Sequence, residues 1–567
     1  MGNYRFRVRL LLVPFCIIAL AFCLKLYFLQ VVHGDRYRER ADRQAVRPQE
    51  GSFDRGTIFF TDRQGKQIAA ASLRSGFALA IKPNEITDAQ GLFDKLSSVI
   101  PLDQAEFLAK AGKQNDPYEI VARQLSDEQA QRIRALKVKS IVLEHEKWRF
   151  YPGGSMAAEV IGFVGFDGDE LKGQYGLERY YGDVLSRKES GLYVNFFAEI
   201  FSAAREAFGS DTDARGDVIT TIEPTTQLSL ERELRLIEET WSTDKVGGII
   251  MDPKTGEIVA MGVYPSFDPN NFGKADPETF KNPLVENVYE MGSIIKPLTV
   301  AAGLDSGKIT ARTTYNDKGF LEVDTERINN FDKKGRGVVS MQEVLSQSLN
   351  TGVAFITDRM GPKLFADYFR RYGLGEETGI DLPGEIPGLV HNLDAPRKIE
   401  IYTASFGQGL AVTPIETVRA LAVLANGGLL VTPHVAKEIR HETGVVRTLS
   451  QPTPTRVIKE ETSREISRML TVVVDEALAE GAIKLEHTSV AAKTGTAQIA
   501  NPNGGGYYED RYLHTFFGYF PAQDPKFIIF LFALEPKGVN YASQTLTQPF
   551  HKLTKFLINY YEIPPDR

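Results

Sequence analysis

Ser293 and Lys296 have the residue types and the spacing of a nucleophile and its base. A serine hydroxyl becomes a nucleophile when a neighbouring base removes its proton. A lysine can be that base when burial or a second cation disfavours its ammonium form. Pro297 follows directly, and proline is tolerated only in the first turn of a helix. We therefore expect Ser293 at the turn into a helix, with Lys296 one turn further along the same face.

The alternative is a helix-capping serine followed by a lysine that extends to solvent. Ser242 and Lys245 have the same spacing at the polar end of an expected helix, so the pair alone does not identify a site. Two residue types at a fixed spacing recur by chance in a chain of this length. Taken by itself, the pair favours the cap over the nucleophile.

Ser348 and Asn350 form a second group, between two apolar segments that we expect to be helices. One interpretation is a loop in which either side chain caps a helix. The other is catalytic, with the hydroxyl of Ser348 relaying a proton and the amide of Asn350 holding a substrate amide. This group alone does not separate the two interpretations.

Lys493, Thr494 and Gly495 form a third group, in the middle of an apolar strand. An interior strand glycine often marks the close approach of a ligand or of another backbone. The lysine would supply positive charge for a substrate carboxylate and lower the pKa of Lys296. Residues 254–256 repeat the same three residue types in a Pro/Gly turn, where the glycine only has to turn a hairpin.

The sequence around these groups predicts the elements that would position them. Strand signals occur at both ends of the second half of the chain, with helical periodicity between them. This order indicates an α+β domain, an antiparallel sheet packed by helices. The expected strands cover 217–223, the hairpin 246–264, 489–499, 515–521 and 526–536; the expected helices cover 225–241 and most of 293–427.

Residues 33–210 are expected to form a separate, extended domain, which we call the pedestal. Residues 55–72 predict two strands around the turn D-R-Q-G, and 86–136 show helical periodicity. A charged stretch with few apolar residues near 202–216 is the best boundary candidate. We therefore assign the larger α+β domain to 211–567.

The N-terminus predicts a membrane anchor. Residues 10–32 are apolar except for Lys25 and Gln30, which is long enough to span a bilayer. A cleaved signal peptide is the alternative, but no small-x-small cleavage site follows. Arginines flank the segment on both sides, so the charge rule for orientation is ambiguous. We expect residues 1–9 in the cytoplasm and the rest of the chain outside.

The composition excludes several function classes. The chain has 567 residues, 43% hydrophobic and 25% charged, and a net charge of −7 gives no nucleic-acid footprint. Both cysteines, Cys16 and Cys23, lie in the apolar N-terminal segment, so no disulfide framework is expected elsewhere. Metal-binding, phosphate-loop and dinucleotide motifs are absent from the sequence, and we expect no metal and no cofactor.

Together, the groups S-x-x-K, S-x-N and K-T-G resemble the motif set of penicillin-binding proteins and serine β-lactamases. The chain is similar over nearly its full length to class B penicillin-binding proteins, which are monofunctional peptidoglycan D,D-transpeptidases. The resemblance implies the fold of that transpeptidase domain on a pedestal of the dimerisation-domain type. Motifs outside the triplet also carry it: Arg55–Ile58 with Asp62–Gly65, Arg149, Tyr151–Pro152, Ile161–Phe163, Gly176–Glu178, and Phe406–Gly409 with Thr413–Pro414.

The resemblance implies a role for each group. Ser293 would attack the penultimate D-Ala carbonyl of a stem peptide ending in D-Ala-D-Ala, Lys296 would be the general base, and β-lactams would acylate the same serine. Ser348 would relay a proton and Asn350 would orient the peptide. Lys493, Thr494, Gly495 and Thr496 would bind the terminal carboxylate, and the backbone N–H groups of Ser293 and Thr496 would form the oxyanion hole.

The sequence departs from the family pattern at Met291, where proline is usual, and at Ile294, where threonine is usual. Asn350 in the middle motif resembles division-type members more than elongation-type ones, so we expect a septal role in the inner (plasma) membrane. The expected protein partners are a polytopic membrane glycosyltransferase and other division or elongation proteins. The alternatives are an elongation-type transpeptidase, a D,D-carboxypeptidase or β-lactamase, and a β-lactam sensor or scaffold.

Overall fold

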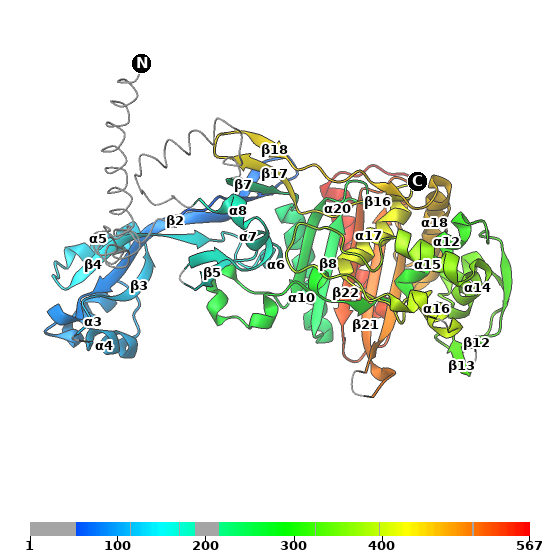
Figure 1. The fold of residues 1–567 in the computed structure, drawn as a ribbon, viewed down its shortest axis with the longest axis horizontal. Helices are drawn as coiled ribbons and strands as arrows, with labels where there is room; N and C mark the ends of the chain where they lie inside the picture. Colours follow the sequence, from blue (N-terminus) through cyan, green and yellow to red (C-terminus); the bar gives the residue numbers. More distant parts are fainter. Residues whose placement is uncertain are drawn as a thin grey trace, which may run out of the picture. The chain divides into compact units, whose positions relative to one another are not determined.

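The structure is a computed structural model that describes residues 53–113, 115–168, 170–187, 215–323, 325–395, 397–501 and 504–567 (Figure 1). The predicted tail 1–9, the anchor 10–32 and the domain boundary between 210 and 211 lie outside these residues. Across the described ranges, we find no helix with both the length and the hydropathy that a bilayer crossing requires.

The chain divides into two compact units, and the division falls within two strands, β2 (Gln67–Ile81) and β4 (Ile141–Phe150). The described part of the smaller unit consists mainly of residues 76–147. The larger unit comprises residues 54–75 and 148–187 and the described chain from 215 onwards. All the predicted site residues belong to the larger unit.

A five-stranded antiparallel sheet forms the centre of the larger unit (Figure 1). Its strand order is β20-β21-β22-β8-β9, so strands from the end of the chain pair with the hairpin that follows the first long helix. The prediction of an α+β fold with strands at both ends of the domain is confirmed. The bounds are β8 Lys245–Met251, β9 Ile258–Tyr264, β20 Ala491–Ala500, β21 Tyr507–Phe520 and β22 Phe527–Leu534.

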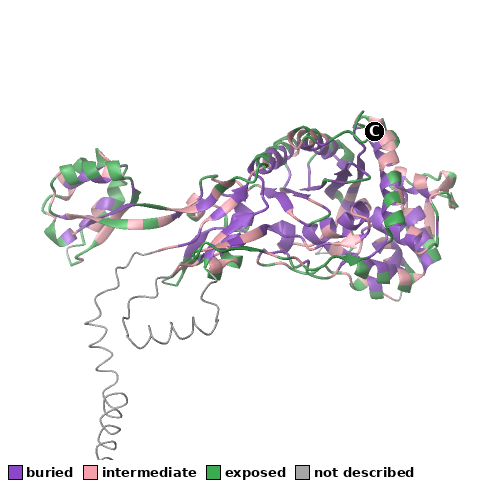
Figure 2. Cartoon of the chain, turned by 90° about the horizontal axis from the view of Figure 1, so that it is seen from above, coloured by how far each residue is buried: buried purple, intermediate pink, exposed green. Residues whose placement is uncertain are grey.

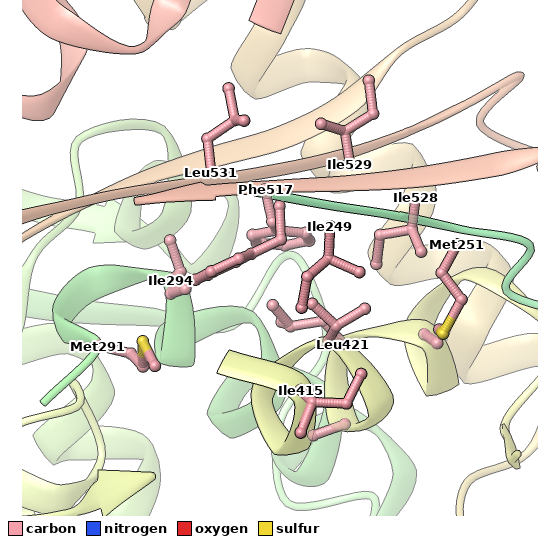
Figure 3. Close-up of a cluster of buried hydrophobic side chains, with 14 of the residues drawn as sticks. Ile249, Met251, Met291, Ile294, Ile415, Leu421, Phe517, Ile528, Ile529 and Leu531 are labelled. Carbon is pink, nitrogen blue, oxygen red and sulfur yellow. The ribbon is translucent and has the colours of Figure 1, made fainter. Parts of the chain in front are cut away.

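Helices pack against this sheet and bury its side chains. The terminal helices α10 and α20 contact each other and strands of the sheet, and α17 and α18 contact β22 and β20. In Figure 3, Ile249 and Ile528 of the sheet point toward Leu421 of α17, whereas Ile529 points to the other face. This alternation is the two-residue period of a strand buried on both faces, and Figure 2 shows the resulting buried centre. The bounds are α10 Pro224–Trp241, α12 Lys296–Asp305, α14 Asn350–Met360, α15 Pro362–Arg371, α16 Lys398–Ala404, α17 Pro414–Ala425, α18 Glu460–Val472 and α20 Thr547–Tyr560, with the shorter α11 Pro283–Glu286, α13 Met341–Ser346 and α19 Ala542–Thr545.

A second sheet of the larger unit contains the predicted strand pair at 55–72. Strand β1 (Ile58–Thr61) pairs antiparallel with β2 around the D-R-Q-G turn and parallel with β7 (Gly216–Thr220). Strand β17 (Ala436–His441) extends the sheet beyond β7, and β18 (Val446–Thr448) pairs with β17.

Three of the motifs outside the triplet meet in one buried ion cluster in this part of the larger unit. The guanidinium groups of Arg55 and Arg149 each donate to the carboxylate of Glu178 at 2.5 Å, and all three side chains are buried. Burial acts to raise the pKa of Glu178, but the two arginines hold it below its ordinary value. Arg149 also donates to the carbonyl oxygen of Gly56, and Tyr151 packs beside the carboxylate. These three motifs are far apart in the sequence, but in the fold they form a single buried cluster.

In the smaller unit, the helical prediction for 86–136 is correct for three helices and wrong for one strand. The helices are α3 Ala89–Ser97, α4 Gln104–Ala111 and α5 Asp127–Ala135. Residues Glu119–Leu125 form β3, which pairs with the second half of β2. Strand β3 is short and its partner strand lies about forty residues earlier, so the periodicity of the local sequence does not predict that this segment is a strand.

The region expected to be mostly helical also contains two small strand pairs, at 314–340. Strands Thr314–Asp317 (β11) and Gly337–Ser340 (β14) pair with each other, as do Phe320–Val323 (β12) and Glu326–Asn329 (β13). We did not predict them, because strands of four residues carry too little alternation to be recognised.

Candidate active site

Ser293 lies in a tight turn between a short strand and a helix, as predicted. Strand β10 (Tyr289–Glu290) pairs with β15 (Ala411–Val412), and Gly292 then turns the chain with a φ of 64°. The 3-10 turn η5 (Gly292–Ile295) leads into α12, which has Pro297 in its first turn. Ser293 is half-buried, whereas its neighbours are fully buried. The hydroxyl is therefore presented at the surface of an otherwise buried turn.

The residues that departed from the family pattern fix this turn to the core. Met291 is 1% exposed and Ile294 0% exposed, and Figure 3 shows both in the apolar cluster that includes Phe517. The hydroxyl of Thr515 donates to the carbonyl oxygen of Met291 (2.9 Å). Sequence reasoning could not interpret these residues. The structure shows that they pack into the core, whereas Ser293 between them stays partly accessible.

Glycines let the nucleophile turn approach its neighbours. Gly495, in the middle of β20, lies so close to the turn that a Cβ atom there would be 2.8 Å from the carbonyl oxygen of Met291. Gly407 accepts the N–H of Gly292 (3.1 Å), and it has a φ of 81°. The prediction that the strand glycine marks a close approach is confirmed, and the approaching groups are the Thr515 hydroxyl of the neighbouring strand and the backbone beside Ser293.

Lys296 is buried at the start of α12 and contacts the second group. Its Nζ atom donates to the carbonyl oxygen of Ser348 (2.6 Å) and lies 3.1 Å from the Ser348 hydroxyl oxygen. Burial, reinforced by the positive charge of Lys493, lowers the pKa of Lys296 well below its ordinary value. A lysine in this environment holds a neutral amine far more readily than a solvated one, as a general base must.

Lys493 reaches the same hydroxyl from β20. Its Nζ atom lies 3.1 Å from the Ser348 hydroxyl oxygen and 3.0 Å from the carbonyl oxygen of Thr494. Burial lowers the pKa of Lys493 to about 8, so this amine remains mostly charged at neutral pH. The predicted lysines and Ser348, from three separate segments of the chain, therefore meet at one hydroxyl group.

Ser348 and Asn350 do not cap the helix that follows them. Ser348 has a φ of 54°, a backbone conformation that is rare for a residue with a side chain and that is often found at functional sites. Leu349 precedes the first residue of α14, and its side chain makes no cap. The Asn350 amide instead donates to the carbonyl oxygen of Asn329 (2.8 Å). The capping interpretation is therefore wrong for this group.

A buried polar network that sequence reasoning missed holds the start of α14. Asp317 is 2% exposed, and its carboxylate accepts from the Thr351 hydroxyl (2.8 Å) and from the Asn330 amide (3.0 Å). Asn330 in turn accepts the backbone N–H of Thr351 (3.2 Å). In the sequence, Asp317 and Asn330 read as ordinary turn residues, so no local signal points to this role.

Two further stretches repeat the motif residues by chance, Ser242 with Lys245 and residues 254–256, and we call them the decoys. Neither belongs to this arrangement. Ser242 is the residue that ends α10, with a φ of 45°. It and Lys245 are therefore close in sequence only because the helix stops at Ser242 and the next strand begins at Lys245. Residues 254–256 form the turn between β8 and β9, in which Gly256 has a φ of 85°. Both structural interpretations made from the sequence are confirmed.

Thr496 lies two residues beyond Thr494 on β20 and therefore on the same face of the strand. Both side chains are half-buried. The Thr496 hydroxyl oxygen accepts the backbone N–H of Ala542 (3.0 Å), the first residue of α19. The edge strand β20 thus places Lys493, Thr494, Gly495 and Thr496 beside the nucleophile turn.

Comparisons with known proteins agree with this geometry. The family described as penicillin binding protein transpeptidase domain matches residues 246–555, and the penicillin-binding protein dimerisation domain matches 52–196. Stage V sporulation protein D of Bacillus subtilis is 32% identical, covering 97% of this chain and 85% of its own length. Peptidoglycan D,D-transpeptidase FtsI of Escherichia coli is 28% identical, with 97% and 91% covered.

Solved structures share the fold. Penicillin-binding protein 3 of Mycobacterium tuberculosis in complex with aztreonam matches with a TM-score of 0.70 at 23% identity, covering 91% of this chain and 98% of that one. Penicillin-binding protein 2X of Streptococcus thermophilus matches with a TM-score of 0.72 at 20% identity, covering 91% of this chain and 81% of that one. With the transpeptidase and dimerisation domains both matched, the chain belongs to the class B penicillin-binding proteins.

Proposed function

We propose that this chain cross-links peptidoglycan as a D,D-transpeptidase, with Ser293 as the nucleophile that forms the acyl-enzyme. The observation that carries the proposal is the convergence of Lys296 and Lys493 on the hydroxyl of Ser348, beside the turn that presents Ser293. A helix cap needs no such convergence of two buried amines. A proton-transfer site does, since the charge of one amine keeps the other neutral.

In the first half-reaction, the neutral amine of Lys296 takes the proton of Ser293 as its oxygen attacks the carbonyl of the penultimate D-Ala. The backbone N–H groups of Ser293 and Thr496 stabilise the oxyanion, each donor contributing about 3 kcal/mol at the transition state. Ser348, placed between the two lysines, carries a proton to the nitrogen of the departing D-Ala. An amine of a second stem peptide then attacks the acyl carbon and gives a proton to Lys296, and the bond to the Ser293 oxygen breaks. The serine oxygen takes that proton back, which completes the cross-link and restores the free hydroxyl.

The donor peptide is recognised by residues of β20 on one side of the site and by Asn350 of α14 on the other. Lys493 supplies positive charge and Thr494 and Thr496 supply hydroxyl groups for the terminal carboxylate. Asn350 already donates through its amide nitrogen, so its carbonyl oxygen is the atom that can accept from a substrate N–H. A β-lactam presents a strained amide and a carboxylate in the same arrangement, and we expect it to acylate Ser293.

We place residues 10–32 across the plasma membrane, with 1–9 in the cytoplasm, the pedestal 33–210 next to the membrane and the transpeptidase domain 211–567 outside. The apolar segment, interrupted only by Lys25 and Gln30, supports the span, and the match of the dimerisation family supports the pedestal. Asn350 in the middle motif favours a septal role over an elongation role. Glycan polymerisation then comes from a partner, a polytopic membrane glycosyltransferase.

Labelling with a fluorescent penicillin tests the proposal. We expect the wild-type chain to form a stable covalent adduct and Ser293→Ala to form none. Ser242→Ala, at the decoy with the same spacing to a lysine, is the matched control and should label like wild type. Labelling of Ser293→Ala, or an unlabelled wild type, would overturn the assignment of the nucleophile.

A cross-linking assay with lipid II and a glycosyltransferase separates the transpeptidase from its rivals. Wild type should produce cross-linked peptide dimers and Lys296→Met should produce none. Release of D-Ala without dimers would identify a D,D-carboxypeptidase, and rapid turnover of penicillin would identify a β-lactamase. Full dimer formation by Lys296→Met would exclude Lys296 as the general base.

A further inference from the structure

A buried chain of polar contacts lies behind Thr496. His514 on β21 is the direct antiparallel partner of Thr496 on β20, so the two side chains lie on the same face of the sheet. His514 is fully buried, and its Nδ1 atom lies 2.9 Å from the hydroxyl of Thr545 at the end of α19. Neither His514 nor Thr545 has a part in the mechanism described above.

The contacts continue from Thr545 back to Thr496. The Thr545 hydroxyl oxygen lies within hydrogen-bonding distance of the carbonyl oxygen of Ala542 (3.2 Å) as well as of the Nδ1 atom of His514. The N–H of the same Ala542 donates to the Thr496 hydroxyl oxygen (3.0 Å). Burial lowers the pKa of His514 to about 4, so the imidazole is neutral at physiological pH. Its Nδ1 atom then either donates to the Thr545 hydroxyl or accepts from it, and in both cases the contact ties His514 to α19.

The network determines which way the Thr496 hydroxyl can donate. Its oxygen accepts from Ala542, so its own hydrogen has to point elsewhere. Among the residues that the structure describes, we find no acceptor for that hydrogen. Thr494 and Thr496 share the strand face that the proposed mechanism assigns to the substrate carboxylate, so the free hydrogen is available to that carboxylate.

We propose that His514 is a positioning residue for recognition of the donor carboxylate: through Thr545 it holds α19 in place, and α19 orients the Thr496 hydroxyl as a donor. This inference rests on the proposed transpeptidase function and adds to it a determinant of substrate specificity. Loss of the His514 contact leaves the Thr545 hydroxyl without its imidazole partner and frees α19 to shift, so that the Thr496 hydroxyl can rotate away from the carboxylate.

The test uses the purified full-length chain and two matched thioester donors, one ending in a free carboxylate and one in a carboxamide. The measured quantity is the ratio of the two kcat/KM values. His514→Leu and Thr545→Val each remove one contact, and His514→Asn keeps an amide, which can donate or accept, near the Nδ1 position. The control is Thr554→Val, at a buried threonine on α20 that is not in this chain of contacts.

We expect His514→Leu and Thr545→Val to reduce the carboxylate preference about tenfold, the usual size of a lost charge-assisted hydrogen bond. Turnover of the carboxamide donor should change little, His514→Asn should restore most of the preference, and Thr554→Val should retain it. An equal loss with both donors would show that the contacts are merely structural, and an unchanged ratio would also overturn the inference. If wild type neither turns over the donors nor labels with penicillin, the proposed function itself fails.

Discussion

Replacing Lys493 by methionine should change the pH dependence of acylation in a way that reports on Lys296. Both Nζ atoms lie 3.1 Å from the Ser348 hydroxyl oxygen, so they are at most about 6.2 Å apart. Two unit charges at that distance repel by about 2.7 kcal/mol at an effective dielectric constant of ~20. This energy corresponds to about two pKa units. The Lys493 charge therefore adds to burial, the larger cause, in lowering the pKa of Lys296.

The sign of the change follows from the role of each amine. Lys296 has to be neutral to accept the Ser293 proton, so the acid limb of the rate profile reports its pKa. In wild type the rate should fall again above about pH 8, because Lys493 loses the charge that binds the carboxylate. In Lys493→Met the acid limb should move up by about two pH units, and the alkaline limb should disappear.

The assay is the second-order rate of Ser293 acylation by a fluorescent penicillin, measured from pH 5 to pH 10. The position of the acid limb is compared, because the overall rate also falls when the carboxylate loses a cationic partner. Lys254→Met, in the hairpin turn that repeats the same motif, is the control and should leave the profile unchanged. An acid limb that stays in place or moves to lower pH in Lys493→Met would refute the electrostatic coupling.

Three further changes test the packing of the site and of its support. Gly495→Ala should slow acylation at least tenfold and lower the melting temperature, because its Cβ would press on the hydroxyl oxygen of Thr515 and on the carbonyl oxygen of Met291. Gly273→Ala, with no described atom within 4 Å of its Cβ, should be neutral in both measurements. Lys296→Met should lose acylation but unfold at a higher temperature than wild type, measured by calorimetry, since a desolvated amine is removed from the interior. Glu178→Gln should lower the free energy of unfolding in urea by about 3–5 kcal/mol, because two buried guanidinium groups lose their carboxylate.

Local chemistry was enough to predict the nucleophile turn. Proline is compatible only with a helix start, so Pro297 alone placed Ser293 where the chain enters α12. In the same way, an interior strand glycine predicted the close approach at Gly495. These features follow from the backbone preferences of one or two residues, which a sequence states directly.

Features that depend on distant partners could not be read in this way. Met291 and Ile294 looked like departures from a pattern, and only the packed core shows that they anchor the turn. The strand β3 was misread because its pairing with β2 overrides local periodicity. The role of Asp317 depends on Asn330 and Thr351, which reach it only after the chain has folded.

The low pKa of Lys296 was expected from the lysine of the K-T-G group and is confirmed, but the burial that contributes most to it could not be read from the S-x-x-K motif. It requires burial at the start of α12 and a second cation from a strand almost two hundred residues later, and neither is a property of the S-x-x-K motif. Burial of the amine and a second cation nearby each lower the stability of the folded chain. The folded chain holds Lys296 with a lowered pKa, so the unfolded chain binds more protons and stability from this group falls as the pH drops below the unfolded value.

The same reasoning explains why the site needs strong support from its surroundings. Two desolvated amines and a residue with a φ of 54° are each unfavourable, and they persist because the neighbouring structure holds them. Hydrogen bonds to the Asp317 carboxylate fix the start of α14 behind Ser348, and buried apolar side chains fix the turn at Ser293. Replacing Lys296 by methionine should therefore stabilise the fold, most of all at low pH, while it removes the proposed base. The unfavourable charge arrangement lowers the pKa of Lys296, which is what the proposed role as a base requires.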